Sequence, residues 1–286
     1  MFAKSSWVHL RIPFSFFLLP VYLFALATSN EVNVFFALIV FVILHLFLYP
    51  ASNGYNSYFD KDEGSIGGLK NPPKVNKGLY NLALVFDAVA LLLSTYNMLF
   101  FFMILVYGLI SKAYSHPSIR IKKYPYASWF IAGFFQGFFT FLMSYIGIID
   151  GNLQDLLQPH ILIAAGLTSV MLWGSYPMTQ IYQHEEDTKR GDVTLSVKLG
   201  ILGTFYFVMI LFSVTSILFF LYFTKYYTAS AALIYLGAMG PVVGFFFYWF
   251  LKVRTDRKKA DFENTMRLNQ LSSLCLNIFF IWLSFQ

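Results

Sequence analysis

Long apolar segments recur along the whole chain, and they constrain its fold more than any other feature of the sequence. Of the 286 residues, 58% are hydrophobic and only 12% are charged, about half the charged fraction of an ordinary soluble domain. A membrane interior about 30 Å thick requires about 20 apolar residues for each crossing helix. We therefore predict an all-α, polytopic membrane protein whose residues 1–286 form a single domain. The nine predicted spans are residues 12–29, 34–58, 79–95, 97–115, 127–148, 160–182, 201–223, 229–250 and 267–285.

The distribution of basic residues supports these nine spans. When successive loops are assigned to alternate sides of the membrane, every Lys and Arg except Lys225 falls on the side of the N-terminus. The positive-inside rule places that side in the cytoplasm, at the cell (inner) membrane, and the C-terminus outside. The isoelectric point, about 9.2, then follows from this topology. We expect contact with membrane lipid and none with nucleic acid.

Two carboxylate-rich segments lie at the ends of the second and sixth spans, at residues 51–64 and 183–192. Because these spans are four apart, both segments lie at the same membrane face, which is the cytoplasmic one. The fourth and eighth spans end at that face in basic segments, residues 115–123 and 252–259. This alternation suggests two four-helix halves and a ninth helix around a central cavity, with the polar side chains gathered at one face.

The carboxylates at this face suit a hard divalent cation. Asn56 and Asp60 are four residues apart and share one face of a helix, so together they could hold one Mg²⁺. The second segment offers another set of oxygen ligands in Glu185, Glu186 and Asp187. Magnesium usually keeps water and substrate phosphate in its coordination shell. We therefore predict a site for a diphosphate that is bound through Mg²⁺.

Basic side chains at the same face can bind phosphate oxygens directly. Those that we expect to do so are Arg120, Lys122, Lys123, Lys189 and Arg190. A prenyl diphosphate combines such a charged head with a long apolar tail, for which the spans supply apolar surface. Breaking its allylic C–O bond leaves diphosphate and an allylic cation, and fixed positive charge beside the leaving group lowers that barrier. The expected catalytic residues are Asp60, Asp187 and Lys122.

The first segment resembles the first aspartate-rich motif of the UbiA-type intramembrane prenyltransferases, and the resemblance covers nearly the whole chain. In that family the motif Asn-Asp-x-x-Asp-x-x-x-Asp ends the second of nine helices. Asn56 and Asp60 match its first Asn and its middle Asp, whereas Ser57 and Gly64 stand where the family has carboxylates. The segments keep other carboxylates as alternative ligands, namely Asp62, Glu63 and Glu186.

The second segment resembles the family's other motif, Asp-x-Asp-x-Asp-x-x-x-Gly-x-x-Thr. Gln183 falls at its first Asp and so at a metal-ligand position, and the matching residues are Glu185, Asp187, Gly191 and Thr194. Lys122-Lys123-Tyr124 is similar to the family's basic pair before the fifth helix, and Arg11-Ile-Pro13 to the start of its first helix. We expect four side chains to line the substrate cavity: Arg11, Asn53, Gln136 and Tyr176.

The resemblance implies transfer of an isoprenoid chain from a (poly)prenyl diphosphate to a small acceptor, with Mg²⁺ as cofactor. The expected acceptor is an aromatic ring, as in quinone biosynthesis. One alternative is a terpene cyclase on the same fold, in which the substrate's own double bonds attack the cation. Another is a transporter of an anionic solute, which would place ionisable groups near the membrane midplane. The spans disfavour a transporter, because apart from His45 and Asp87 they are nearly free of ionisable groups.

Replacing Asp60 or Asp187 with alanine tests this site. Both variants should remain folded, because each loses one polar side chain at the end of a helix. Turnover of a prenyl diphosphate should fall by about a hundredfold or more, which corresponds to about 3 kcal/mol of barrier. The measurement is the steady-state rate of each purified variant. Near-normal turnover in both would contradict the predicted site.

Overall fold

A computed structural model describes residues 2–30 and 32–286, in which the regular elements are helices and one isolated β-bridge joins Ile66 and Leu69. The first elements are α1 (Lys4–His9), η1 (Ile12–Phe17), α2 (Leu19–Ala27), α3 (Val34–Phe41), η2 (Val42–Leu48), α4 (Tyr49–Asp60), α5 (Gly78–Leu93), η3 (Ser94–Tyr96), α6 (Met98–Ser115), η4 (Ile121–Lys123), α7 (Pro125–Gly133) and η5 (Phe134–Phe139). They are followed by α8 (Thr140–Ile149), α9 (Leu153–Leu156), α10 (Pro159–Ser175), η6 (Tyr176–Gln183), α11 (His184–Arg190), α12 (Leu195–Tyr226), α13 (Ala229–Thr255), η7 (Arg257–Lys259) and α14 (Phe262–Leu283). Of the η elements, η2 and η5 are π-helical and the others are 3₁₀-helices.

Within the described residues, seven helices are long and apolar enough to cross a membrane, and a pair bent by 44° near the N-terminus makes eight at most. The bent pair consists of Lys4–Phe17 and Leu19–Ala27. Pro20 lies in the first turn of α2, where backbone N–H groups have no acceptor within the helix, so a proline costs no helical hydrogen bond. α14 has 22 residues but is not among the seven. The protein is therefore a multi-pass helical protein, as predicted.

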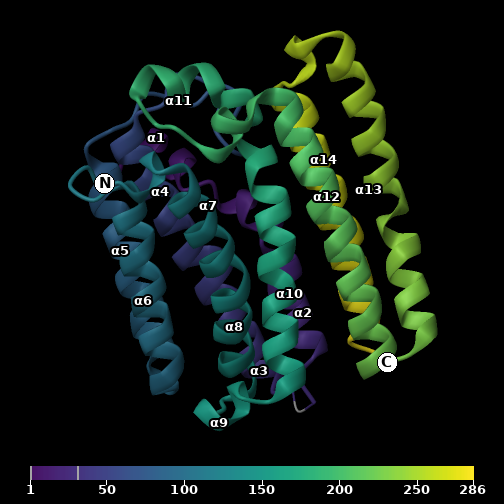
Figure 1. The fold of residues 1–286 in the computed structure, drawn as a ribbon. Helices are drawn as coiled ribbons and strands as arrows, with labels where there is room; N and C mark the ends of the chain where they lie inside the picture. The colour runs from purple at the N-terminus through teal and green to yellow at the C-terminus, as the bar shows by residue number, and fades with distance from the viewer. Residues whose placement is uncertain (1, 31) are drawn as a thin grey trace.

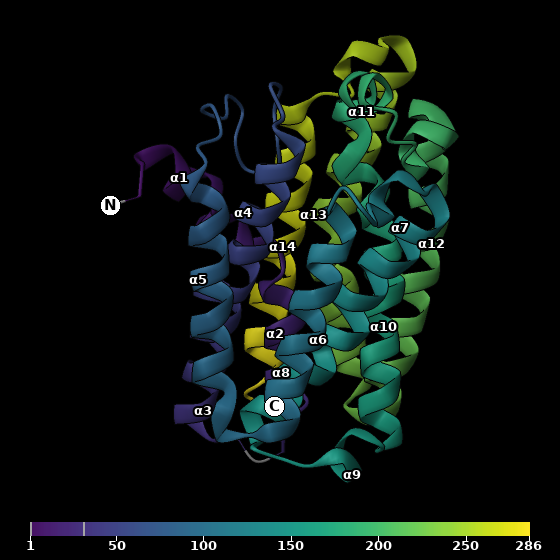
Figure 2. The ribbon, with the colours of Figure 1, turned by 90° about the vertical axis from the view of Figure 1, so that its left-hand side faces the viewer.

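The long helices form one bundle whose two ends differ (Figures 1 and 2). α1, α11 and the loop between α4 and α5 lie at one end, and α9 lies at the other. The two chain termini lie at opposite ends of the bundle (Figure 1). The carboxylate-rich segments therefore share one end, the arrangement that the order of the spans predicts.

The sixth predicted span, residues 160–182, lies within one candidate span, Pro159–Arg190, but its helical geometry changes along the chain. α10 ends at Ser175, and a 3₁₀-helix, η6, continues to Gln183 before α11 begins. Pro177 stands at the start of η6, and a proline inside an α-helix removes one hydrogen bond and clashes with the preceding turn. The 3₁₀-helix thus lies between the apolar helix α10 and the short polar helix α11.

Close packing of α10 against η5 fixes the centre of the bundle. A Cβ atom built on Gly137 would lie 2.6 Å from the backbone Cα and N of Ser169, so only glycine permits this approach. The hydroxyl of Ser169 accepts a hydrogen bond from the N–H of Phe138 (2.9 Å) and donates one to the carbonyl of Gly133 (3.0 Å). Small residues at a helix contact allow such short separations within membranes.

We expect Gly137→Ala to destabilise the protein by about 2 kcal/mol or more, because the added methyl group meets backbone rather than a movable side chain. The measurement is thermal unfolding in detergent micelles. Gly166→Ala is the matched control on α10, since a Cβ there has no neighbour within 4 Å, and it should unfold at the wild-type temperature or slightly above. Equal effects of the two substitutions would contradict the packing described.

Candidate active site

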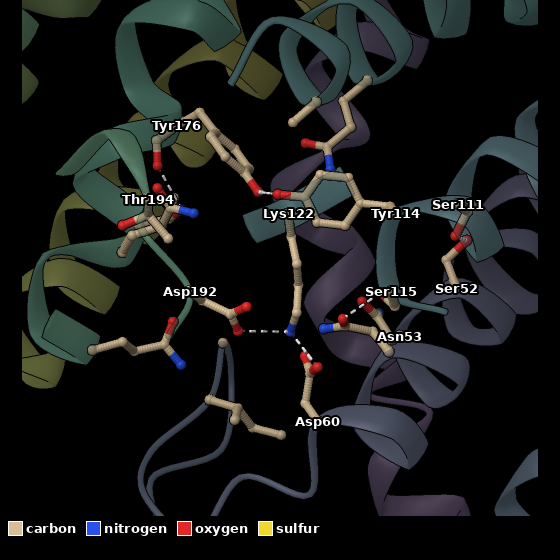
Figure 3. A pocket seen from close by; sticks show the side chains of 18 of the residues that line it. Ser52, Asn53, Asp60, Ser111, Tyr114, Ser115, Lys122, Tyr176, Asp192 and Thr194 are labelled. Carbon is tan, nitrogen blue, oxygen red and sulfur yellow. Dashed lines mark hydrogen bonds and ion pairs between the residues drawn. The ribbon is translucent and has the colours of Figure 1, made fainter. Parts of the chain in front are cut away.

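A cavity of about 260 Å³ lies at the end of the bundle that carries α11, and both carboxylate-rich segments reach it (Figure 3). Its polar part is lined by charged side chains from α4, η4, α11 and the loops that follow α4 and α11: Asp60, Asp62, Lys122, Asp187, Arg190 and Asp192. An apolar and aromatic part of its wall comes from α6, α7 and η5, with Tyr107, Ile110, Ile131, Ala132 and Phe135. A charged region and an apolar region thus meet in one space.

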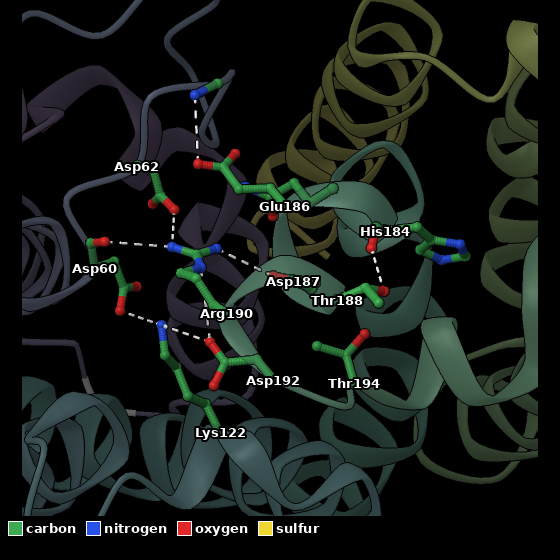
Figure 4. A network of polar contacts seen from close by, with 12 residues as sticks. Asp60, Asp62, Lys122, His184, Glu186, Asp187, Thr188, Arg190, Asp192 and Thr194 are labelled. Atoms are coloured by element: carbon green, nitrogen blue, oxygen red, sulfur yellow. Dashed lines mark hydrogen bonds and ion pairs between the residues drawn. The ribbon is translucent and has the colours of Figure 1, made fainter.

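Lys122 joins the two carboxylate-rich segments (Figures 3 and 4). Its ammonium group forms an ion pair with Asp60 at the end of α4 and lies 3.7 Å from Asp192, which follows α11. Arg120 completes the group, because its Nε and Nη2 atoms donate to the two oxygens of Asp192 at 3.0 and 2.9 Å. Two carboxylates that are far apart in the sequence therefore share cations from the turn between α6 and α7.

Arg190 makes a second connection between the same segments (Figure 4). Its guanidinium group donates to Asp62, which follows α4, and to Asp187 on its own helix at 3.2 Å. The Nε atom lies 3.9 Å from Asp192. Carboxylates buried to this extent need such partners, because removing an unpaired charge from water costs several kcal/mol.

The local backbone aims these carboxylates at one another. α4 ends because Lys61 adopts a left-handed conformation (φ 50°), which reverses the chain and brings Asp62 back toward α11. α11 ends in the same way at Gly191 (φ 74°). There the N–H of Gly191 donates to the carbonyl of Thr188 (3.1 Å) and that of Asp192 to the carbonyl of Asp187 (2.9 Å), the pattern of a Schellman motif. This turn places Asp192 beside Arg120.

The cations also set the ionisation of Asp192, which lies in the loop before α12. Burial alone would raise the pKa of Asp192, but the bidentate hydrogen bond from Arg120 and the charges of Lys122, Arg120 and Arg190 hold the pKa below its ordinary value. The same hydrogen bond raises the pKa of Arg120. Asp192 is therefore ionised at neutral pH and acts as an acceptor.

Uncharged polar side chains also line the cavity beside the ion pairs. The hydroxyl groups of Tyr114 and Tyr176 are 2.5 Å apart, and Ser115 donates to the side-chain oxygen of Asn56 at 2.6 Å (Figure 3). Asn53 donates weakly to the carbonyl of Leu10 (3.4 Å). Gln136 also lines the cavity.

A second cavity, about 240 Å³, adjoins the first and extends among α10, α12, α13 and α14. Among the described residues its lining includes no charged side chain. Seven residues line both cavities and so lie where the two adjoin: Phe14, Ser52, Asn53, Tyr107, Gln136, Tyr176 and Thr179. The charged end of the site is therefore next to a mainly apolar space inside the bundle.

The loop between α4 and α5 covers the polar end of the first cavity. Ile66 is buried and lines the cavity, and the carbonyl of Gly67 accepts a hydrogen bond from Arg11 at 3.1 Å. Glu186 accepts from the backbone N–H groups of Glu63 (3.0 Å) and Gly64 (3.4 Å). The loop is thus attached to α11 through the side chain of Glu186.

Most of the residues expected in the site lie around this cavity. Those lining it are Arg11, Asn53, Asn56, Asp60, Lys122, Gln136, Tyr176, Gln183, Asp187 and Arg190. Arg120 is outside the lining but donates hydrogen bonds to Asp192, and Glu186 accepts a hydrogen bond from the covering loop. The side chains of Lys123, Glu185 and Lys189 are exposed and lie outside the described lining. Two residues that we had not placed in the site, Tyr114 and Asp192, belong to it.

Across residues 2–30 and 32–286, no three His, Cys, Asp or Glu side chains converge closely enough to hold a metal ion by themselves. The donor set nevertheless fits Mg²⁺, which typically takes one or two carboxylates and completes its shell with water and substrate phosphate. Asp60 and Asp187 line the same cavity from opposite segments, and Asn56 adds an amide oxygen beside Asp60. These three residues could each contribute one ligand.

The fold and this cavity define a helical membrane protein with ion-paired side chains at one end of the bundle and a mainly apolar cavity beside them. Residues 17–273 match the model of the UbiA prenyltransferase family. The chain belongs to the UbiA prenyltransferase family. A search of curated protein sequences gave no match.

Solved structures of similar fold agree with this assignment. A UbiA homolog from Archaeoglobus fulgidus bound to GPP and Mg²⁺ has a TM-score of 0.68 at 16% identity, covering 99% of this chain and 100% of that one. The same homolog bound to DMAPP and Mg²⁺ gives 0.69 at 16% identity, with 98% and 99% covered. A digeranylgeranylglyceryl phosphate synthase gives 0.64 at 20% identity, with 99% of both chains covered. At these identities the likeness concerns the fold.

Asp192→Asn should lower the free energy of unfolding by about 2 kcal/mol at pH 7, because Arg120 loses a charged acceptor. The lowered pKa of Asp192 means that its stabilisation is complete above about pH 4 and is lost as the pH falls through the folded-state pKa. The difference from wild type should therefore shrink below about pH 4.

Thermal unfolding from pH 3 to pH 7 measures this difference. Glu185→Gln is the matched control, because it makes the same chemical change at an exposed side chain and should stay within about 0.5 kcal/mol of wild type. A difference for Asp192→Asn that is independent of pH would contradict the ion pair.

Proposed function

We propose that the protein transfers a prenyl group from a prenyl diphosphate to a small acceptor inside the membrane. The observation that carries this proposal is the group of three cations and four carboxylates at the mouth of an apolar cavity. In a chain of this family, such a group suits a substrate with a multiply charged head and a hydrocarbon tail. Neither a purely polar nor a purely apolar molecule would use both regions.

The cations would bind the diphosphate by exchanging partners. Lys122, Arg120 and Arg190 are each held by carboxylates, so they are already in position before a substrate arrives. A diphosphate carries about three negative charges and offers bidentate acceptors to the two arginines. As the C–O bond breaks, both bonding electrons leave with the diphosphate, and the growing charge on its oxygens is met by the same fixed cations.

Asp60, Asp187 and Asn56 would hold Mg²⁺ together with the diphosphate oxygens, while Gln183, Glu185 and Glu186 contribute less than the sequence suggested. When bound, Mg²⁺ would further neutralise the charge on the leaving group. Once Lys122 and Arg190 turn to the diphosphate, Asp60 and Asp187 need another cation, which links metal binding to substrate binding.

The apolar part of the site would receive the prenyl chain and the acceptor. The faces of aromatic side chains such as Tyr107, Tyr114 and Phe135 could stabilise the allylic cation, since aromatic rings attract positive charge. Gln136 lines both cavities, so it could orient an acceptor there by hydrogen bonding. We propose an aromatic acceptor of the kind that leads to quinones.

We further propose nine crossings, with α14 as the last and the bent N-terminal pair as the first. Twenty-two residues of helix extend about 33 Å, which is enough to span the membrane interior. The end with α11 would face the cytoplasm of a cell (inner) membrane, because every Lys and Arg except Lys225 belongs to that side.

The test uses purified protein with Mg²⁺ and radiolabelled geranyl or farnesyl diphosphate, with and without a panel of quinone precursors. We expect a labelled adduct that requires both the acceptor and Mg²⁺, and its loss in Asp60→Ala. A cyclic hydrocarbon formed from the diphosphate alone would replace this proposal with a terpene cyclase. Complete recovery of unreacted diphosphate with every acceptor would refute enzymatic transfer.

A further inference from the structure

Two departures from the family's motifs lie on either side of one contact in the folded protein. Gly64 stands at the last aspartate position of the first motif, and Gln183 at the first aspartate position of the second. The side chain of Gln183 donates a hydrogen bond to the carbonyl of Ser65, the residue next to Gly64, at 3.1 Å. Both departures therefore occur where α11 and its preceding turn meet the loop that covers the cavity.

Gly64 is also the residue that lets Glu186 reach this loop. A Cβ atom at Gly64 would lie 2.6 Å from the second carboxylate oxygen of Glu186, so any larger side chain would displace that carboxylate. The first oxygen accepts hydrogen bonds from the N–H groups of Glu63 and Gly64. The carboxylate of Glu186 is thus hydrogen-bonded to the covering loop and does not point into the cavity.

Other contacts hold the rest of the loop over the cavity. The carbonyl of Gly67 accepts from Arg11, and the ring of Phe14 lies against Gly67 and Gly68 so closely that a Cβ at Gly67 would be 2.5 Å from it. Lys70 forms an exposed ion pair with Glu263 at the start of α14. The loop is therefore attached to η1, η6, α11 and α14, and Gln183 and Glu186 supply the attachment nearest the charged groups.

We propose that Gln183 and Glu186 are positioning residues that latch residues 63–66 over the reaction site, in place of the metal-ligand role that the family's motif implies for position 183. The inference rests on the proposed function for its chemical consequence. The latched loop keeps water from the allylic cation. When water reaches that cation, a C–O bond forms, the proton leaves to solvent, and the products are prenyl alcohol and diphosphate. Loosening the latch should therefore divert substrate from transfer to hydrolysis.

The decisive measurement is hydrogen–deuterium exchange of the backbone amides of residues 61–70 in the full-length protein without substrate. Glu186→Ala removes the acceptor of two of these amides, so their exchange should become about fivefold faster, the ratio expected for losing one ordinary hydrogen bond. Glu186→Gln keeps an acceptor oxygen and should stay within about twofold of wild type. Equal exchange in the alanine variant and the wild type would overturn the latch.

Gln183→Asp separates the two roles of position 183, because it restores the family's carboxylate and removes the donor to Ser65. A latch predicts faster exchange and a fraction of prenyl alcohol about fivefold higher in the presence of acceptor. A metal ligand predicts unchanged exchange and tighter Mg²⁺ dependence, which would overturn the proposal. Gln154→Asp, at an exposed residue of α9, is the matched control and should change neither. Since exchange needs no turnover, it tests the latch even if no acceptor is found.

Discussion

The pairing of Asp60 with Lys122 and of Asp62 with Arg190 is the constraint on which the site depends. Carboxylates at the ends of membrane helices are costly unless a cation accompanies them, and here each cation comes from a different segment than its carboxylate. The ends of α4 and α11 and the turn before α7 must therefore meet if any of these charges is to be buried. The ion pairs hold the lining of the cavity together, and under the proposed function a substrate would bind by replacing them.

Much of this arrangement could be predicted from the sequence because it follows from length and topology. Apolar segments of crossing length gave the helices, and their order placed residues 51–64 and 183–192 at one end of the bundle. The change to a 3₁₀-helix at Tyr176–Gln183 was not predicted, because residues 160–182 are apolar enough to suggest one regular helix. Asp192 was missed because its partner depends on the turn at Gly191, and composition shows a charge but not its direction. The exposure of Lys123, Glu185 and Lys189 was not predicted, because the sequence shows that these residues are charged but not which way their side chains point.

Glu186 shows the difference between what the spacing of residues in a sequence predicts and what the folded geometry decides. Spacing identified Glu186 as an alternative ligand because it is acidic and lies in the right segment. In the folded chain its carboxylate meets two backbone N–H groups, which satisfy it without a metal. The role of a carboxylate in such a segment therefore depends on which hydrogen-bond donors lie beside it in the folded protein. Here Gly64 has no side chain, which leaves room for the carboxylate of Glu186 to approach the backbone N–H groups.

The two joined cavities differ in polarity in the same order as the layers of a membrane leaflet. Charged groups lie at one end of the first cavity, and neutral polar groups such as Asn53 and Gln136 line both cavities where they adjoin. The second cavity is mainly apolar. The change from polar to apolar surroundings that occurs at the membrane surface is thus repeated inside the protein. An amphiphile sliding in from the surrounding leaflet would keep its head hydrated or ion-paired and its hydrocarbon in oil-like surroundings throughout, so entry would demand little solvation work.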